Sequence, residues 1–261
     1  MSAAAGAPLA GRFLTAQWRW LAMANYEVPP ALLAPYVPRG VELDDWRGKY
    51  YLSVVGFLFV QTRVGGIPVP GHRHFEELNL RFYVRRDVGN ERRRGVVFIK
   101  ELVPRRAIAW VARWIYNEPY TALPMRHELR GLPDPRTTPA GAPLNSPPQS
   151  RSVAYEWQLA GRWQALRLTA GTDLAPLVPG SEAEFITEHY WGYCRQRDGG
   201  TVEYQVEHVP WRVAHASSAC LEADVASLYG PSFVEYLGGE PASAMLAEGS
   251  PIAVRRPRRL V

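Results

Sequence analysis

Hydrophobic and polar residues alternate along several segments of the chain with the two-residue period of β-strands. The clearest case is 75–86 (FEELNLRFYVRR). Its apolar positions are Leu78, Leu80, Phe82 and Val84, and its polar positions are Glu77, Asn79, Arg81, Tyr83 and Arg85. Successive side chains of a strand point to opposite faces. One face of this strand is therefore predicted to lie in the core and the other in solvent or in a polar cavity.

Other segments rich in β-branched and aromatic residues also indicate strands. They are 16–24, 50–60, 95–103, 121–129, 151–159, 162–169, 185–195, 202–208 and 212–220. Helical spacing of apolar residues predicts a helix at 105–116, and shorter helices are predicted at 30–36 and 222–229. Strands outnumber helices, which predicts an α+β fold with a curved, largely antiparallel sheet forming a cone or barrel.

The composition of the chain suggests one folded domain between a flexible N-terminal segment and a basic C-terminal tail. Residues 1–11 are expected to be a flexible N-terminus, 12–250 a single domain, and 251–261 a basic tail. The Pro-rich segment 131–150 is expected to be a long surface loop, because strand-like segments flank it. A linker between two domains is the alternative.

The formal net charge of +5 does not indicate a nucleic-acid-binding surface, because it is concentrated at one end of the chain. Arg255, Arg256, Arg258 and Arg259 account for four of these charges. A groove that follows phosphates needs basic residues clustered on one folded face, whereas the other arginines are interspersed with acids. The terminal RRPRR is expected to be a solvated tail, with a docking or nucleic-acid-binding segment as the alternative.

No segment is long and apolar enough for a membrane helix. The longest apolar run, 50–60, is about half of the ~20 residues that cross a bilayer. The first residues lack the basic start and apolar stretch of a secretory signal. Cys194 and Cys220 are too few for a disulfide framework. A cytoplasmic protein without a membrane partner is therefore expected.

The motifs of several large enzyme classes are absent. The sequence contains no GxSxG, HExxH, GxGxxG or GxxxxGKS/T. His72, His74 and Glu76 fall at strand spacing and form a candidate metal triad. Metal ligands must converge, however, whereas these residues follow one another along the chain, so solvated histidines are the favoured interpretation. No metal or other cofactor is expected.

Two further groups of polar residues could carry acid–base chemistry. Lys100 and Glu101 end an apolar strand, and a buried lysine has a lowered pKa that permits imine formation with a carbonyl compound. A structural ion pair is the alternative. In the turn YNEPY, Asn117, Glu118 and Tyr120 bring together an amide, a carboxylate and a phenol. A helix C-terminal turn capped by Asn117 explains this turn equally well.

Several ordered motifs over roughly residues 15–225 resemble the YqjF-like family of uncharacterised bacterial proteins. They are PYVPRGVELDDW, FEELNLRFYVRR, GVVFIKELVPRRAIA, YNEPY with PMRH, and EHVPWRV. That family is similar in fold to acetoacetate decarboxylase, whose barrel-like antiparallel sheet encloses a central cavity. The decarboxylase's VPEPLE-like turn, AIPV hairpin and AIA helix are matched by VPRGVE at 37–42, GIPV at 66–69 and AIA at 107–109.

The resemblance does not extend to the catalytic lysines of the decarboxylase. Counted from Ala107, these fall within 118–120, where the chain has Glu118, Pro119 and Tyr120. The acid that precedes the hairpin falls near Arg63. The resemblance therefore implies that imine-dependent decarboxylation at that site is lost. Lys100 could replace the missing lysine only if it points into the same cavity.

The expected cavity then has a new polar lining, provided that the polar face of 75–86 looks inward. The substrate-binding candidates are Arg63, Glu77, Asn79, Arg81, Tyr83, Glu101 and His208, and the catalytic candidates are Glu118, Tyr120 and Lys100. Arg81 or Arg63 is the expected anion-binding group.

These residues predict a protein that binds or acts on a small organic acid or carbonyl compound. The alternative is a non-catalytic ligand sensor or protein-interaction module, which a filled interior and an exposed aromatic patch would favour. The sequence leaves homo-oligomer formation open.

Overall fold

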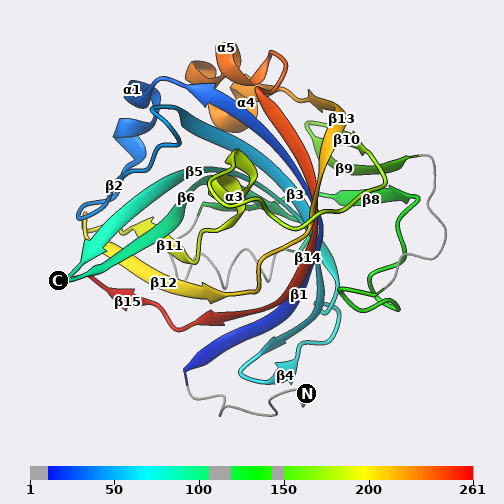
Figure 1. Cartoon of the computed structure of the whole chain (residues 1–261), viewed down its shortest axis with the longest axis horizontal. Coiled ribbons are helices and arrows are strands. Elements are labelled where there is room, and N and C mark those ends of the chain that lie inside the picture. The colour runs from blue at the N-terminus through cyan, green and yellow to red at the C-terminus, as the bar shows by residue number, and fades with distance from the viewer. Residues whose placement is uncertain (1–10, 106–118, 143–149, 261) are drawn as a thin grey trace.

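The fold is organised around a ring of strands (Figure 1). The computed structural model describes residues 11–105, 119–142 and 150–260. In order of hydrogen bonding, the ring consists of β12 (Thr201–Glu207), β11 (Trp191–Arg195), β6 (Glu91–Val103), β5 (Phe75–Val88), β3 (Tyr50–Val64), β1 (Arg12–Val28) and β14 (Ser243–Arg255). Two residue pairs between β12 and β14 close it. Only β6 and β11 pair in parallel within the ring, so the expected curved and largely antiparallel sheet is confirmed.

Local irregularities bend the long strands around the ring. Trp20 and Gln61 have φ angles of 54° and 57°, and the register of β1 against β3 shifts beside each of them. Gly249 has a φ of 81°, and a Cβ at this position would collide with the carbonyl oxygen of Trp18. Such bulges increase the local twist of a strand. They allow strands of 13 to 17 residues to curve around an interior space.

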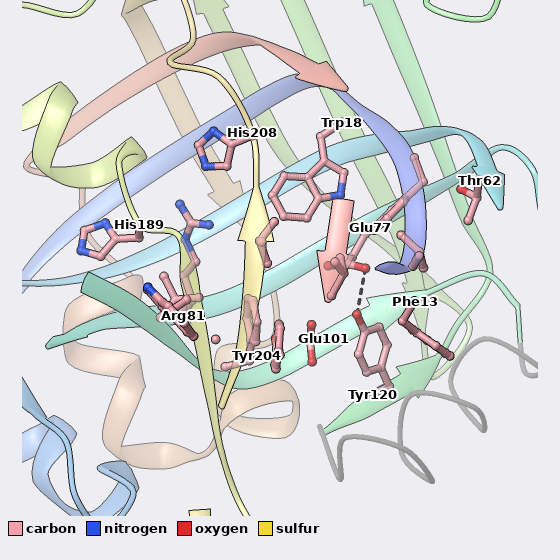
Figure 2. Close-up of a pocket in the computed structure, with 18 of the residues that line it drawn as sticks. Phe13, Trp18, Thr62, Glu77, Arg81, Glu101, Tyr120, His189, Tyr204 and His208 are labelled. Atoms are coloured by element: carbon pink, nitrogen blue, oxygen red, sulfur yellow. Dashed lines mark hydrogen bonds between the residues drawn. The ribbon is translucent and has the colours of Figure 1, made fainter. Parts of the chain in front are cut away.

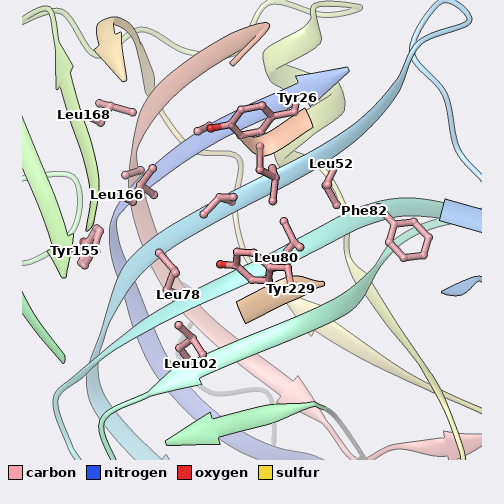
Figure 3. Close-up of a cluster of buried hydrophobic side chains, with 14 of the residues drawn as sticks. Tyr26, Leu52, Leu78, Leu80, Phe82, Leu102, Tyr155, Leu166, Leu168 and Tyr229 are labelled. Atoms are coloured by element: carbon pink, nitrogen blue, oxygen red, sulfur yellow. The ribbon is translucent and has the colours of Figure 1, made fainter. Parts of the chain in front are cut away.

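A second sheet packs against the outside of the ring. β13 (Val213–Glu222) pairs with β14, and β10 (Arg162–Ala170), β9 (Arg151–Leu159) and β8 (Met125–Arg130) follow it in order. Figure 3 shows the buried apolar cluster between the layers, where Tyr155 and Leu166 of the second sheet approach Leu78 and Leu80 of the ring. This cluster is the larger part of the core.

Short elements complete the structure. They are β2 (Glu42–Leu43), β4 (Ile67–Pro68), β7 (Tyr120–Ala122), β15 (Arg258–Arg259), α1 (Pro30–Leu33), η1 (Ala34–Tyr36), α3 (Glu182–Thr187), α4 (Val225–Tyr229), η2 (Pro231–Phe233) and α5 (Val234–Leu237). The short helices predicted at 30–36 and 222–229 are thus present. The helix predicted at 105–116 lies outside the described residues, apart from residue 105.

Two predicted strands differ from the structure. The first part of 185–195 belongs to α3, because the Ser181 hydroxyl accepts a hydrogen bond from the Glu184 amide at 3.1 Å and starts a helix. The segment 121–129 is divided into β7 and β8 around Pro124, which has no N–H to donate to a strand ladder. Within the Pro-rich segment, residues 131–142 form no helix or strand.

The C-terminal arginines also differ from expectation. β14 continues to Arg255, and β15 pairs with β12, where Arg258 lies opposite Glu203. Nε of Arg258 donates to the buried Glu203 carboxylate at 2.5 Å. Arg255, Arg258 and Arg259 are held in ordered strands by carboxylate partners, while their side chains stay 48%, 57% and 60% exposed.

None of the helices in the described ranges is long and apolar enough to cross a membrane.

Candidate functional site

The inside of the ring contains a cavity of about 220 Å³ with a mainly apolar wall. Its aromatic lining residues are Phe13, Trp18, Phe59, Phe75, Phe98, Tyr120, Trp191, Tyr204 and Trp211. Its polar lining residues are Thr62, His72, Glu77, Arg81, Glu101, Thr187, His189 and His208. Figure 2 shows that Arg81, His189 and His208 gather toward one end, whereas Glu77, Glu101 and Tyr120 lie toward the other.

β5 contributes charged groups to this cavity because its two faces have different neighbours. Leu78 and Leu80 pack into the apolar cluster outside the ring, whereas Glu77 and Arg81 line the cavity. The strand is therefore buried on both sides, and the polar face identified from the alternation looks inward.

Arg81 is a nearly buried cation that pairs with none of the carboxylates in the described part of the chain. The residue is 8% exposed, and its Nη2 donates to the carbonyl oxygen of Ile186 at 3.3 Å. Across the described ranges, the buried Nε has no hydrogen-bond partner, and no acidic side chain forms an ion pair with Arg81. Burying a charge is unfavourable unless the charge is paired. This guanidinium therefore favours an anionic ligand.

A hydrogen-bonded carboxylate lies toward the other end of the cavity. Glu77 accepts one bond from the Tyr120 hydroxyl at 3.1 Å and another from Nδ2 of Asn79 at 3.3 Å. Tyr120 reaches Glu77 because β7 pairs with the end of β6, where Glu101 lies opposite Tyr120. A phenol and carboxylate in contact can together donate and accept a proton.

A buried histidine is held uncharged near Arg81. Burial lowers the pKa of His189 to about 4, although Nε2 lies only 3.7 Å from Oδ2 of Asp44. Burial also raises the pKa of Asp44, but contacts with His189 and Arg94 outweigh this effect and hold it at about 2. The result is a charged aspartate beside a neutral imidazole.

His208 is the second histidine toward this end. Its ring stacks between Tyr190 and Trp211, with centroid distances of 4.6 Å and 4.4 Å. Nδ1 lies 3.0 Å from the carbonyl oxygen of Val209. Burial lowers the pKa of His208, and the nearby positive charge of Arg81 acts in the same direction. Both histidines therefore present neutral rings to the cavity at pH 7.

Of the predicted site residues, the structure brings Glu77, Arg81, Glu101, Tyr120 and His208 together around the cavity. Asn79 and Tyr83 are buried on the same face of β5 but do not line it. Asn79 bonds to Glu77, and the Tyr83 hydroxyl lies 2.8 Å from Oγ of Ser53. Glu118 lies outside the described residues.

Lys100 and Arg63, like Asn79 and Tyr83, do not line the cavity, and neither of them faces it. Lys100 pairs with Leu80, whose face of the sheet is turned toward the outer apolar cluster. A bulge in β6 shifts the register at this point, so that Phe98 and Glu101 both face the cavity while Lys100 faces away from it. Arg63 is exposed and donates to the carbonyl oxygen of Gly66 at 3.3 Å. Its neighbours on β3, Thr62 and Val64, line the cavity instead.

The candidate metal triad does not converge. His72 lines the cavity, Nδ1 of His74 accepts from the Gln61 amide at 3.4 Å, and Glu76 lies 2.6 Å from Nδ1 of His127. Among the residues described, no group of three or more His, Cys, Asp or Glu side chains is arranged to hold a metal ion.

The sequence interpretation missed His189 and Asp44. Neither residue stands in a motif, and they meet only after α3 and β11 return to the ring beside β6. The only local hint of this site in the sequence is His189 itself, which follows the short segment that forms α3.

The chain has the fold of the acetoacetate decarboxylase-like proteins, with a cavity inside the ring of strands. An acetoacetate decarboxylase-like enzyme from Sphingomonas wittichii RW1 is similar to this chain with a TM-score of 0.62 and 15% identity, over 100% of this chain and 99% of that chain. The enduracididine biosynthesis enzyme MppR, in its complex with pyruvate, is similar with a TM-score of 0.61 and 13% identity, over 100% of this chain and 93% of that chain. At these identities the likeness concerns the fold.

The family DUF2071, described as an uncharacterized conserved protein, matches residues 15–251, and the chain belongs to this family. The uncharacterized protein YqjF of Bacillus subtilis (strain 168) is 31% identical over 115 residues. This match spans about half of each protein, 44% of this chain and 46% of YqjF. The resemblance seen in the sequence motifs is therefore confirmed.

Proposed function

We propose that this protein binds a small organic acid inside the ring and that Arg81 pairs with the carboxylate of the ligand. The observation that carries this proposal is the nearly buried guanidinium, which lines the cavity and has no acidic partner among the described residues. Arginine presents its donors as a planar fork that matches a carboxylate. The carboxylate of the ligand would supply the negative charge that none of the described residues provides for Arg81.

The comparisons support this proposal through the fold. MppR, whose fold is similar, has a structure in complex with pyruvate, which is a small organic acid. The enzyme from Sphingomonas wittichii RW1 is of the same fold. The interaction-module alternative has less support, because the exposed large aromatic residues in the described ranges, Tyr36 and Trp163, lie on separate elements.

A second candidate function, acid–base catalysis on the bound acid, is favoured by the contact between Glu77 and Tyr120. Tyr120 is the proposed proton donor and Glu77 the proton acceptor. The chemistry does not use a lysine imine, because the two lysines of the chain, Lys49 and Lys100, are not among the lining residues.

Thermal-shift and calorimetric titration with carboxylates and their amides test the binding proposal. Pyruvate, propionate and phenylacetate are each compared with the corresponding amide, which keeps the shape but removes the charge. We expect a carboxylate to stabilise the protein and its amide to have no effect. Arg81→Gln is expected to weaken carboxylate binding at least tenfold, as estimated from hydrogen bonds to charged groups.

Arg63→Gln is the matched control, because Arg63 lies on a neighbouring strand but outside the cavity. This variant is expected to bind as the wild type does. Unliganded Arg81→Gln is expected to be at least as stable as the wild type, because it no longer buries an unpaired charge. Equal stabilisation by acid and amide, or full binding by Arg81→Gln, would contradict the proposal.

A further inference from the structure

We propose that the cavity takes up its acid together with a proton, with the carboxylate beside Arg81 and the proton on His189. This inference rests on the proposed function, which assigns the carboxylate of the ligand to Arg81. It adds the residue that receives the proton, so that the net ligand taken from solution is the neutral acid, divided between two side chains inside the ring.

His189 is a buried base in the wall of the same cavity as Arg81. Figure 2 shows both residues toward one end of the cavity. The His189 side chain is 1% exposed, and within the described ranges neither of its ring nitrogens forms a hydrogen bond. Burying a polar group without a partner is unfavourable. The imidazole is therefore a site that a change of charge in the cavity can bring into use.

Arg81 and His189 are close enough for their charges to interact. Both lie against the ring of Tyr83, with Cζ of Arg81 at 5.6 Å and the imidazole centroid at 4.7 Å from its centroid. Burial is the main cause of the low pKa of His189, and the positive charge of Arg81 lowers it further. A carboxylate paired with Arg81 offsets this charge, which favours the protonated imidazole.

The ligand is expected to change the charge around His189 more than its burial. The side chain is already 1% exposed, so a molecule that fills the cavity can remove little more water from it. Desolvation by the ligand is therefore small, whereas its negative charge is new. The sign of the effect follows: acid binding raises the pKa of His189, and by linkage protonation of His189 strengthens acid binding.

A partner for the protonated ring is already in place. Oδ2 of Asp44 lies 3.7 Å from Nε2 of His189, slightly beyond hydrogen-bond distance. Its carboxylate stays charged beside Arg94, whose Nε donates to it at 2.8 Å. The Asp44 amide also donates to the carbonyl oxygen of Tyr83 at 3.0 Å, which holds this residue beside β5. A proton on Nε2 would complete a charge-assisted hydrogen bond to Asp44 after a small movement.

Several titratable and charged groups surround His189. They are Asp44, Arg81 and Tyr83 of β5, Arg94 of β6, the adjacent Glu188, and His208, while Phe185 of α3 adds an apolar ring. The Tyr83 hydroxyl bonds to Ser53, and Glu188 accepts a hydrogen bond from the Tyr190 hydroxyl. The remaining competitor for the proton is the second imidazole.

His208 differs from His189 in what its ring nitrogen faces. Burial lowers its pKa, and Arg81 acts in the same direction, so a bound carboxylate affects both histidines. However, Nδ1 of His208 lies 3.0 Å from a carbonyl oxygen, that of Val209, and its ring stacks between Tyr190 and Trp211. A carboxylate stabilises an imidazolium more than a carbonyl does. His189 is therefore the imidazole expected to gain the proton.

Counting protons during pyruvate binding tests this inference. Unbuffered protein and pyruvate, both set to pH 5, are mixed in a pH-stat, and the acid needed to restore the pH gives the protons taken up. Pyruvate stays ionised at this pH, so the ligand itself exchanges no proton. We expect uptake of about half a proton or more per protein molecule at pH 5 and nearly none at pH 8. Pyruvamide, which has no charge, is expected to cause no uptake.

The affinity for pyruvate is expected to follow the same linkage. Calorimetric titration is expected to show binding about threefold or more tighter at pH 5 than at pH 8. Amine buffers are required, because a carboxylate or sulfonate buffer would compete for Arg81. Histidine-ring NMR of the wild-type protein adds a readout that needs no variant. The most acidic imidazole is expected to titrate at higher pH when pyruvate is present.

Variants of the two histidines assign the proton. His189→Gln is expected to abolish the uptake and to remove most of the pH dependence of pyruvate affinity. His208→Gln is the matched control, because it removes an imidazole that lines the same cavity and is also affected by Arg81. This variant is expected to keep the proton uptake of the wild type at saturating pyruvate.

The outcomes separate this inference from the proposed function. If pyruvate binding depends on Arg81 but is equally tight at pH 5 and pH 8 and takes up no proton, the inference is overturned while acid binding stands. If His189→Gln takes up as many protons as the wild type, the assignment to His189 is wrong. If pyruvate does not bind, or binds equally well to Arg81→Gln, the proposed function fails and this inference fails with it.

Discussion

His189 is a base that the fold keeps uncharged although an aspartate lies beside it. Its ring packs against Tyr83 and Phe185 at 4.7 Å and 5.3 Å, so water has little access to it. Asp44 in turn receives a hydrogen bond from Nε of Arg94 at 2.8 Å, which satisfies the carboxylate without protonating the imidazole. The arrangement makes the stability of the protein depend on pH.

The free energy of unfolding is expected to fall as the pH decreases from about 6.5 to about 4. In this window the unfolded chain protonates His189 at its ordinary pKa, whereas the native state, with a pKa of about 4, does not. The unfolded state therefore binds more protons and gains stability. The difference between the ordinary and the native pKa of His189 corresponds to a loss of about 3 kcal/mol in the free energy of unfolding, as an upper value. Urea unfolding at pH 7 and pH 4.5 measures the difference.

His189→Gln provides the control for this effect. The variant lacks the titrating group, so its loss of stability between pH 7 and pH 4.5 is expected to be smaller by most of that amount. His74 and His208, whose pKa values burial also lowers, contribute equally in both proteins. An identical loss in wild type and variant would show that His189 does not control the acid response. Below pH 4, protonation of Asp44 is expected to destabilise both proteins, because its native pKa of about 2 lies under the ordinary value.

The site residues that the sequence predicted correctly are those placed by local geometry. The alternation in 75–86 sufficed for Glu77 and Arg81, because a strand turns successive side chains to opposite faces. Lys100 failed because the bulge opposite Leu80 and Arg81 exchanges the inward and outward positions of β6. His189 could not be predicted, since its place depends on the pairing of β11 with β6.

At the scale of elements, β3 of the ring and β9 of the outer sheet approach each other at a glycine. A Cβ added at Gly56 would lie 2.5 Å from Cδ2 of Tyr155. The Tyr155 hydroxyl donates to the carbonyl oxygen of Trp20 at 2.7 Å, which fixes the ring over β3. The two layers therefore depend on the absence of a side chain at residue 56.

Gly56→Ala is expected to destabilise the protein by about 1–3 kcal/mol, because Tyr155 must move and weaken its contact with Trp20. Gly171→Ala is the matched control. A Cβ there meets nothing within 4 Å, so its effect is expected to stay within about 0.5 kcal/mol. Equilibrium unfolding in urea compares the two, and similar values for both variants would contradict the close packing of the layers.

The strands that the sequence predicted best are the buried ones. The segments 50–60, 75–86 and 95–103 all lie within longer strands of the ring. The middle of each of these strands is a buried run of mostly apolar residues, which the sequence shows clearly. Polar residues near some of their ends hide how far the strands continue. The prediction at 185–195 failed at its start because a helix cap at Ser181 outweighs the aromatic, β-like composition that follows.

At the scale of the whole molecule, one buried carboxylate joins the end of the chain to the ring. Glu203 on β12 is 1% exposed and accepts hydrogen bonds from Arg86, Arg93 and Arg258, at 3.2 Å, 3.0 Å and 2.5 Å. These arginines come from β5, β6 and β15. Arg93 and Arg258 also lie over the ring of Trp191, which lines the cavity.

Glu203→Gln is therefore expected to lower the free energy of unfolding by about 3 kcal/mol or more, because it removes the charge that three arginines share in a buried place. Asp198→Asn is the matched control, since Asp198 pairs with Arg259 of the same short strand but is exposed. An exposed pair contributes at most about 1 kcal/mol. Urea unfolding of both variants measures the difference, and phenylacetate titration shows whether the cavity survives. If Glu203→Gln lowered the free energy of unfolding no more than Asp198→Asn does, the contacts of β15 with Glu203 would not contribute to holding the cavity wall in place.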